Sequence, residues 1–369
     1  MVLQFLYNPL HTAYYHARVL LGLNEKPAIK KLKSLGGDAK KMSPHALNVL
    51  KKLSEAGYET YLVGGCIRDL LCKQEPKDFD IATAATPEKV KKVFGRKARI
   101  IGRRFRIVHV IEGGELIEVS TFRAKESAGS KWFARKQNNN VYGTSIQDVW
   151  RRDFSCNALF YDAGKQEVID YVGGLSAIKK RTVDMIGVPK QRLMEDPVRI
   201  LRAIRFRAKT QFTIEPSLEL AIRENANLLK KASAERLLIE VTKLFYHGHG
   251  VQSWHLLKEY GVIDILFPGM AKLDEKKHAH HLQFIERSLQ STDKRYQTGQ
   301  YLSTGYLFAV LLWPLFMERL QEKKGPQSHV YYQKCMEEVL KQEGRVVSIP
   351  KRLQEAIIMI WQLQSLLII

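Results

Sequence analysis

The chain has 369 residues, of which 45% are apolar, and its 59 Lys and Arg against 38 Asp and Glu give a formal charge of +21. This apolar content excludes a disordered tail and allows two or three folded domains. Such a large excess of positive charge is typical of proteins that bind a polyanion, with nucleic acid ahead of an acidic membrane.

The N-terminal segment predicts neither a signal peptide nor a membrane span. His11, His16 and Arg18 interrupt its apolar patches, and no small-residue cleavage site follows. Residues 1–42 are rich in lysine, and we expect a basic, mobile arm there, with a merely solvated tail as the alternative. The four cysteines have neither zinc-site nor disulfide-framework spacing, which favours a reducing, cytoplasmic location.

The first folded elements have clear boundary signals. We expect a helix over 44–57, a strand over 59–65, helices over 66–73 and 87–95, and a β-hairpin over 103–123. Ser43 and Thr86 are suited to cap the first and third helices, each followed by a proline. The Gly113-Gly114 pair is suited to the turn of the hairpin.

The rest of the chain changes from strands to helices. Residues 124–143 are polar and irregular, and we interpret them as a flexible loop over the site. A second hairpin is expected about Gly164, and beyond residue 174 the pattern is almost entirely that of helices. The sequence therefore predicts an α+β protein whose strands come first and whose helices follow.

The stretch "DFDIAT" carries the first candidate site. Its alternation places Asp78 and Asp80 on one face of a strand, while Phe79 and Ile81 point into the core. Two such carboxylates can bind a pair of Mg²⁺ ions, although a solvated strand edge is the commoner explanation of this spacing.

A glycine pair supports the metal interpretation. Gly64 and Gly65 lie where a strand turns into a helix, so backbone N–H groups there can hold a triphosphate, with Arg68 one turn further on. A phosphate cradle beside a metal-binding pair is what nucleotidyl transfer requires.

Two further carboxylates are candidates for the same metal site. Glu118 lies on a neighbouring predicted strand and is expected to point opposite to Ile117 and Val119. Asp153 follows two arginines in "RRDF". The structural alternatives are a helix cap for Asp153 and a salt bridge to Arg123 or Arg106 for Glu118. The sequence leaves this choice open.

The stretch "EDPVRILRAIRF" is the second constellation. Asp196 is suited to cap a helix, and Arg199, Arg202 and Arg205 recur along it as a basic ridge. A capped surface helix is the simpler interpretation. In the functional one, Asp196 and Arg199 present an acceptor and a donor to the Watson–Crick edge of a base.

These motifs carry a resemblance. "LVGGCIRDLL", "KDFDIAT", "IEVSTFR", "RRDFSCNALFYD" and "EDPVRILRAIRF" resemble, in order, the motifs of the class II tRNA nucleotidyltransferase and bacterial poly(A) polymerase family. The resemblance spans roughly residues 58–270 and implies a polymerase-β-like head with a mixed sheet, followed by helical neck and body domains. It implies the boundaries 1–42 for the arm, 43–180 for the head, 181–270 for the neck and 271–369 for the body.

The resemblance also implies roles for individual residues. It implies that Asp78 and Asp80 bind the metal and that these two residues and Asp153 are catalytic. It implies that Gly64, Gly65 and Arg68 contact the triphosphate and that Arg152 and Arg202 contact the nucleotide. It implies that Asp196 and Arg199 select the base. Two Mg²⁺ ions and ATP are the expected cofactor and substrate.

Within the family, "IIGRRFRIVHV" is similar to the poly(A) polymerase branch. Residues 89–108 hold nine basic side chains and no acidic one, so we expect Arg103, Arg104 and Arg106 to contact the RNA backbone. Bacterial poly(A) polymerases usually continue past a segment like "IPKRLQEAIIMIWQLQ" into more helix and a basic tail, so a shortened C-terminus is expected here.

We therefore expect a template-independent enzyme that adds AMP from ATP to RNA 3′ ends. A CCA-adding tRNA nucleotidyltransferase would use the same residues, and a non-catalytic RNA-binding protein with a polymerase-like head is the alternative from another class. A metal site at His278, His280 and His281 is less favoured than a solvated helix start, because no Cys or acidic partner has suitable spacing.

Overall fold

The computed structural model describes residues 30–33, 40–102, 106–124, 141–274, 276–300, 302–322 and 328–367. The chain forms two compact units, Met1–Val188 and Pro189–Ile369. Within the described residues, no helix combines the length and the apolar character that a membrane crossing needs. The finer division into arm, head, neck and body stays a prediction.

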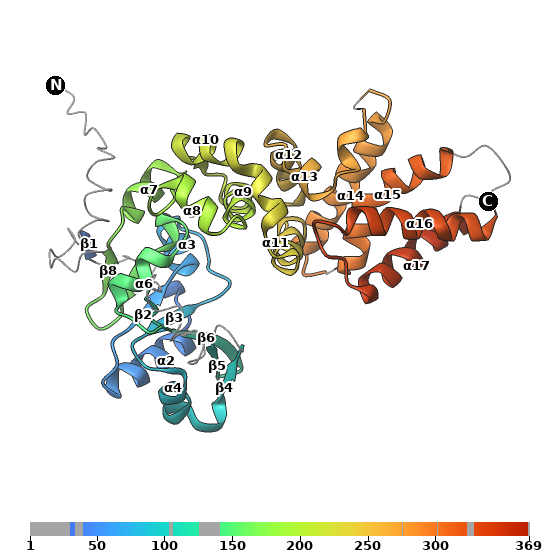
Figure 1. Ribbon diagram of the computed structural model, residues 1–369. Helices are drawn as coiled ribbons and strands as arrows, with labels where there is room; N and C mark the ends of the chain where they lie inside the picture. The colour runs from blue at the N-terminus through green and yellow to red at the C-terminus, as the bar shows by residue number, and fades with distance from the viewer. Residues whose placement is uncertain are drawn as a thin grey trace, which may run out of the picture. The chain divides into compact units, whose positions relative to one another are not determined.

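The first unit is built on an eight-stranded mixed sheet (Figure 1). Its strands are β1 (Lys30–Lys33), β2 (Thr60–Val63), β3 (Asp80–Thr83), β4 (Ala98–Ile101), β5 (Ile107–Glu112), β6 (Glu115–Thr121), β7 (Phe160–Asp162) and β8 (Glu167–Asp170). Their order is β1-β8-β7-β2-β3-β6-β5-β4, and β3 and β6 are parallel while the other neighbours are antiparallel. The predicted mixed sheet and both hairpins are confirmed.

Helices complete this unit. They are α2 (Pro44–Glu55), α3 (Gly65–Leu71), α4 (Pro87–Phe94), α6 (Ser145–Arg151) and α7 (Gly174–Lys180), with the 3₁₀ turns η2 (Gly95–Lys97) and η3 (Ser155–Asn157) and the short strand β9 (Thr182–Val183). The predicted caps are confirmed, since Ser43 accepts from the N–H of Ala46 at 3.1 Å and Thr86 from that of Lys89 at 3.5 Å. Apolar side chains of α2, α3 and α4 pack on one face of the sheet to form its core.

The edge strand β1 corrects one expectation. Lys30–Lys33 belong to the segment predicted as a mobile basic arm, yet they pair antiparallel with Glu167–Asp170 of β8. Lys31 also forms an ion pair with Glu167 at 3.1 Å. A run of lysines that looks mobile in sequence is thus an edge strand, a position where lysine discourages further strand pairing. The predicted loop over the site falls mostly on residues 125–140, outside the described residues.

The second unit is helical, as predicted. Its elements are α8 (Pro189–Glu195), α9 (Arg199–Thr210), β10 (Thr213–Ile214), α10 (Pro216–Asn225), η4 (Ala226–Lys231), α11 (Ala234–Tyr246), α12 (Gly250–Glu259), α13 (Val262–Leu266), η5 (Met270–Lys272), α14 (Ala279–Gln297), α15 (Thr304–Gln321), α16 (His329–Glu343) and α17 (Lys351–Leu367). Trp361 is buried and donates to the carbonyl of Ala309 at 3.0 Å, which ties α17 to α15.

Candidate active site

Asp80 begins β3, and Asp78 precedes the strand by two residues. Phe79 and Ile81 are 7% and 0% exposed, whereas both aspartates are exposed. The predicted alternation is therefore confirmed, but Asp78 lies in the segment before the strand and not within it. This segment is less constrained than the strand, because it lacks ladder hydrogen bonds.

The turn at Gly64 brings the site together. Its backbone has φ +80°, a conformation that favours glycine. A Cβ atom at this position would lie 3.8 Å from Oδ2 of Asp80 and 3.7 Å from Nη1 of Arg152. The end of β2, the start of β3 and the segment after α6 therefore meet at Gly64, which places a carboxylate and a guanidinium beside the turn.

The electrostatics of Asp80 are unusual for an aspartate. Although Asp80 is partly solvent-exposed, desolvation by the protein atoms around its carboxylate and then the negative charge of Glu118 raise its pKa to about 6, with a smaller contribution from Asp78, while Arg152 acts in the opposite direction. Glu118 has this influence because it is the register partner of Asp80 on the parallel strand β6. Ile117 and Val119 are buried and Glu118 is not, as the sequence predicted.

Arg152 is held in place from several directions. It donates to Oδ2 of Asp148 at 3.0 Å and to the carbonyl of Asn157 at 3.4 Å, and its guanidinium lies 5.2 Å from the centre of the Phe160 ring. These contacts orient the positive charge beside Gly64 before any ligand arrives.

Arg68 lies deeper than the sequence predicted. Its side chain is buried, and it donates to Asp69 at 2.8 and 2.6 Å and to Oδ1 of Asn157. The N–H of Gly64 donates to the carbonyl of Leu159 at 3.4 Å, so the turn offers fewer backbone donors than expected. Direct triphosphate contact by Arg68 stays a prediction. In the structure, its hydrogen bonds to Asp69 and Asn157 hold the start of α3, directly after the turn, in place.

Asn157 was missed by the sequence analysis. Its side chain accepts from Arg68 and its carbonyl accepts from Arg152, so it joins the two arginines nearest the turn. The only sequence signal is a polar residue within the otherwise apolar end of "RRDFSCNALFYD". Such a residue often satisfies a buried partner, but the sequence does not identify that partner.

The structure gives different surroundings to Asp153 and Glu118, the two candidates for the third carboxylate. Asp153 lies between α6 and η3, is half-buried, and its backbone carbonyl accepts from the N–H of Ile186 at 2.9 Å. The charges that shift the pKa of Asp80 are instead those of Glu118, Arg152 and Asp78. Glu118 is thus brought to Asp80 by the sheet, and a catalytic role for Asp153 stays a prediction.

The carboxylates suit a divalent cation in their chemistry. Asp78 and Asp80 supply oxygen ligands of the kind Mg²⁺ prefers, and the crowding of negative charge that raises the pKa of Asp80 is what a cation would relieve. Across the described parts of the chain, however, no three His, Cys, Asp or Glu side chains are gathered closely enough to hold a metal ion. Metal binding stays a prediction.

The second unit holds the residues predicted to select the base. Helix α9 begins at Arg199 with Val198 as its N-cap residue and has no side-chain cap hydrogen bond, so the expected cap at Asp196 is wrong. Asp196 lies three residues before the helix and accepts from the N–H of Val198 at 3.3 Å. Arg199 is 9% exposed and donates to the carbonyl of Arg192 at 2.6 Å.

The predicted basic ridge is corrected. Arg202 and Arg205 face α11, where the buried carboxylate of Glu240 accepts from them at 3.5 and 2.9 Å. The three-residue spacing that predicted a basic ridge therefore builds a polar contact between two helices.

The predicted RNA contacts are only partly visible. Arg103 and Arg104 lie outside the described residues, while Arg106 forms an ion pair with Glu88 at 2.5 Å.

Among the three histidines weighed as a metal site, His278 pairs with Glu318 at 3.0 Å, and the ring of His281 is buried.

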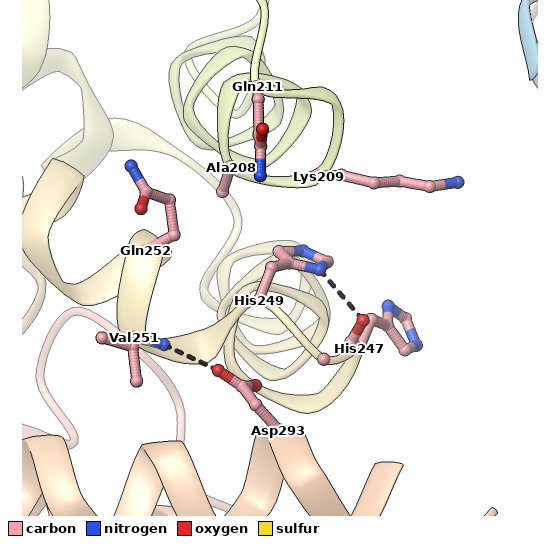
Figure 2. Close-up of a pocket in the computed structure, with 9 residues that line it drawn as sticks. Ala208, Lys209, Gln211, His247, His249, Val251, Gln252 and Asp293 are labelled. Atoms are coloured by element: carbon pink, nitrogen blue, oxygen red, sulfur yellow. Dashed lines mark hydrogen bonds between the residues drawn. The ribbon is translucent and has the colours of Figure 1, made fainter. Parts of the chain in front are cut away.

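A polar cleft of about 360 Å³ lies in the second unit between the end of α9 and the start of α12. Figure 2 shows Lys209, His247 and His249 around it, with Asp293 below. Burial, and then the positive charges of His247, Arg205 and Lys209, lower the pKa of His249 to about 4. The cleft is thus lined by the positive charge of Lys209 and by the carboxylate of Asp293, which accepts from the N–H groups of Gly250 and Val251 at 2.8 and 3.1 Å.

The chain matches two described protein families. Residues 60–184 match the "Poly A polymerase head domain" and residues 211–273 the "Probable RNA and SrmB- binding site of polymerase A". These segments contain the carboxylates of the first unit and most of the cleft of the second.

The chain is also similar to individual poly(A) polymerases and CCA-adding enzymes. The chain is 41% identical to poly(A) polymerase I of Haemophilus influenzae over 333 residues, which cover 87% of this chain and 74% of that protein. It is 40% identical to the CCA-adding enzyme of Lactobacillus johnsonii over 199 residues, covering 54% of this chain and 49% of that enzyme. The crystal structure of the Bacillus stearothermophilus CCA-adding enzyme with CTP matches with a TM-score of 0.55 and 25% identity, over 86% of this chain and 82% of that one.

Proposed function

Because the chain belongs to the poly(A) polymerase family of nucleotidyltransferases, we propose that it adds AMP from ATP to RNA 3′ ends, without a template, in messenger RNA processing and decay. The observation that carries this proposal is the extent of the likeness. Identity of 41% to a poly(A) polymerase I runs over 87% of the chain. Identity of 40% to a CCA-adding enzyme runs over 54% of the chain, and the CCA-adding enzyme whose fold matches 86% of the chain is 25% identical. A relative that is alike over the helical second unit as well as the first unit is the better guide to the RNA product, because in the proposed function the second unit selects the base.

In the proposed reaction, the RNA 3′-hydroxyl oxygen forms a bond to the α-phosphorus of ATP while the bond to the bridging oxygen of pyrophosphate breaks. The turn at Gly64 and Gly65 approaches the triphosphate closely, since neither glycine has a side chain to obstruct it. Arg152, anchored by Asp148, lies beside that turn and neutralises phosphate charge.

Members of this nucleotidyltransferase family generally use divalent metal ions. Here Asp78 and Asp80 would hold Mg²⁺, with Glu118 or Asp153 as the further carboxylate. Bound Mg²⁺ supplies activation of the attacking hydroxyl and neutralisation of the leaving group. The carboxylates must be ionised to bind it, so the raised pKa of Asp80 makes metal binding weaker below about pH 6.

Base selection falls to the second unit. Asp196 would accept a hydrogen bond from the exocyclic amine of adenine, Arg199 would donate beside it, and Arg202 would contact the nucleotide. The cytosine amine offers the same donor, so rejection of CTP would depend on how much room the site leaves for a purine.

RNA would be held by basic side chains in both units. Arg103, Arg104 and Arg106 of the first unit and the cleft around Lys209 in the second offer positive charge to phosphates.

A cytoplasmic location agrees with the four cysteines, which are all free thiols.

Incubation with a generic RNA, Mg²⁺ and either ATP or CTP tests this function. A tail of many adenylates from ATP supports it. Addition of two C residues and one A to a tRNA lacking its 3′ end, followed by a stop, would establish the CCA-adding alternative. RNA binding without extension by any nucleotide would instead indicate a non-catalytic RNA-binding protein.

A further inference from the structure

A row of polar side chains crosses the sheet of the first unit. Arg99 of β4 is the register partner of His109 of β5, and His109 is in turn the register partner of Glu118 of β6. Glu118 is the register partner of Asp80 of β3. Residues directly opposite each other have their side chains on the same face of a sheet. The row therefore leads from the candidate active site to the edge strand β4, roughly 14 Å away at the usual spacing of strands.

This row lies on the face of the sheet opposite to α2 and α4. The alternate residues of β5 and β6 are buried in the core that these two helices share with the sheet; they are Val108, Val110, Ile117 and Val119. On the face of the row, Arg99 is exposed, and His109 and Glu118 are half-buried. A ligand can therefore reach the row from solvent.

The charge of the row changes sign along its length. Asp80 and Glu118 supply carboxylates at one end, Arg99 supplies a guanidinium at the other, and the imidazole of His109 between them can donate an N–H. RNA carries one negative charge at each phosphodiester, whereas its terminal 3′-hydroxyl is uncharged. Charge complementarity therefore places the 3′-hydroxyl at the carboxylates and the phosphodiesters toward Arg99, because the opposite direction would bring phosphates against carboxylates.

An apolar pair borders the row. Ile111 and Leu116 are register partners on β5 and β6, and they are 54% and 55% exposed. Each lies two residues from the row, Ile111 from His109 and Leu116 from Glu118, so their side chains are on the same face. Exposed apolar surface beside a line of charge suits a nucleotide, whose base and sugar lie next to a charged backbone.

We propose that this row binds the 3′ end of the RNA substrate, with His109 donating to the phosphodiester nearest the 3′ end and Arg99 pairing with the next one. Ile111 and Leu116 contact the sugar and base between them. The inference rests on the proposed function, which places the 3′-hydroxyl at Asp80. It adds a path for the RNA across β6 and β5 to β4, along which successive phosphates are separated by a distance comparable to the strand spacing.

The test removes the charge of one phosphate at a time. Hexaadenylate is prepared with a neutral methylphosphonate either at the linkage nearest the 3′ end or at the next one, and the KM for each primer is measured in extension assays with ATP. For wild type, each neutral linkage should raise the KM about tenfold, because a hydrogen bond to a charged group is lost.

The variants assign each phosphate to its side chain. Arg99→Ala should raise the KM for unmodified hexaadenylate about tenfold and should respond less than about twofold to the second neutral linkage, while it still responds to the first. His109→Ala should show the reverse pattern. Both variants should keep the KM for ATP within about twofold of wild type. Additive losses from Arg99→Ala and the second neutral linkage would overturn the proposal.

Two further variants serve as controls. Arg99→Lys keeps the positive charge, so it should keep most of the response to the second neutral linkage. Lys51→Ala removes a charge from α2 on the opposite face, where the Lys51 side chain is 72% exposed, and should respond to both neutral linkages as wild type does. An effect of Lys51→Ala equal to that of Arg99→Ala would show that only the total charge of the protein matters, and would overturn the proposal.

Failure of this inference is distinct from failure of the proposed function. If wild type does not extend hexaadenylate or longer RNA with ATP, the proposed function is wrong and this inference falls with it. If wild type extends RNA, but Arg99→Ala and His109→Ala respond to the neutral linkages as wild type does, the function stands and the RNA follows another path.

Discussion

Asp80 and Glu118 are register partners on the parallel strands β3 and β6, and their mutual repulsion contributes to raising the pKa of Asp80 to about 6. Two carboxylates placed side by side on a rigid sheet cost stability in the absence of a cation. Such a loss of stability is expected at a site that binds a cation, because the bound cation relieves the repulsion.

Asp80→Ala and Asp78→Ala should each abolish nucleotide transfer while leaving the protein folded. Loss of a carboxylate that holds the proposed cation should slow the reaction by roughly a thousandfold or more. Extension of labelled RNA measures the loss, and Glu55→Ala, an exposed carboxylate of α2, serves as the control. Near-normal extension by a folded Asp80→Ala protein would refute the site assignment.

Asp80→Asn should stabilise the metal-free protein at neutral pH. The pKa of Asp80 is raised above its value of about 3.9 in an unfolded chain, so its ionisation makes folding less favourable as the pH rises from about 4 to 6. Asparagine removes this penalty. Thermal unfolding with a chelator should show a Tm about 2 °C higher for the variant above pH 6 and no difference below pH 4. A variant less stable than wild type at pH 7.5 would contradict this account.

Glu118→Gln distinguishes the two candidates for the third carboxylate. Without the charge of Glu118 the pKa of Asp80 should fall, so the acid limit of activity should move to lower pH. If Glu118 also binds the cation, the Mg²⁺ concentration for half-maximal activity should rise about tenfold. Asp153→Asn is the comparison: a larger Mg²⁺ effect there than in Glu118→Gln would assign the role to Asp153.

Asn157→Ala should destabilise the first unit. It leaves the buried Arg68 without one of its acceptors, which typically costs about 2 kcal/mol of unfolding free energy. Denaturant unfolding measures this loss. Asn48→Ala is the control and should cost less, because its partner Glu112 keeps Lys52 and Lys97. Equal effects of the two variants would argue against a supporting role for Asn157.

RNA affinity should fall steeply as salt is added, because lysine and arginine contacts to phosphate release counterions. Lys209→Glu in the cleft should weaken RNA binding and reduce the salt slope by about one, with the KM for ATP unchanged. Lys341→Glu on α16 is the control. Filter binding at several salt concentrations measures both, and a flat salt dependence would exclude a phosphate-binding surface.

The local features of this protein followed from its sequence. The alternation around Phe79 and Ile81, the caps at Ser43 and Thr86 and the turn at Gly113-Gly114 were predicted and confirmed. Each depends on residues within a few positions of one another, where backbone geometry alone decides which face is buried and where a helix begins.

Only the tertiary structure decided which side chains meet. The sequence indicated that Glu118 faces away from the core, but the parallel register of β3 and β6 selected Asp80 as its partner. The arginine spacing of α9 predicted a basic ridge, and the packing of α11 places Arg202 and Arg205 in contact with Glu240. Periodicity tells which face of an element is polar, whereas the partner on that face comes from a distant segment brought there by burial of the apolar side.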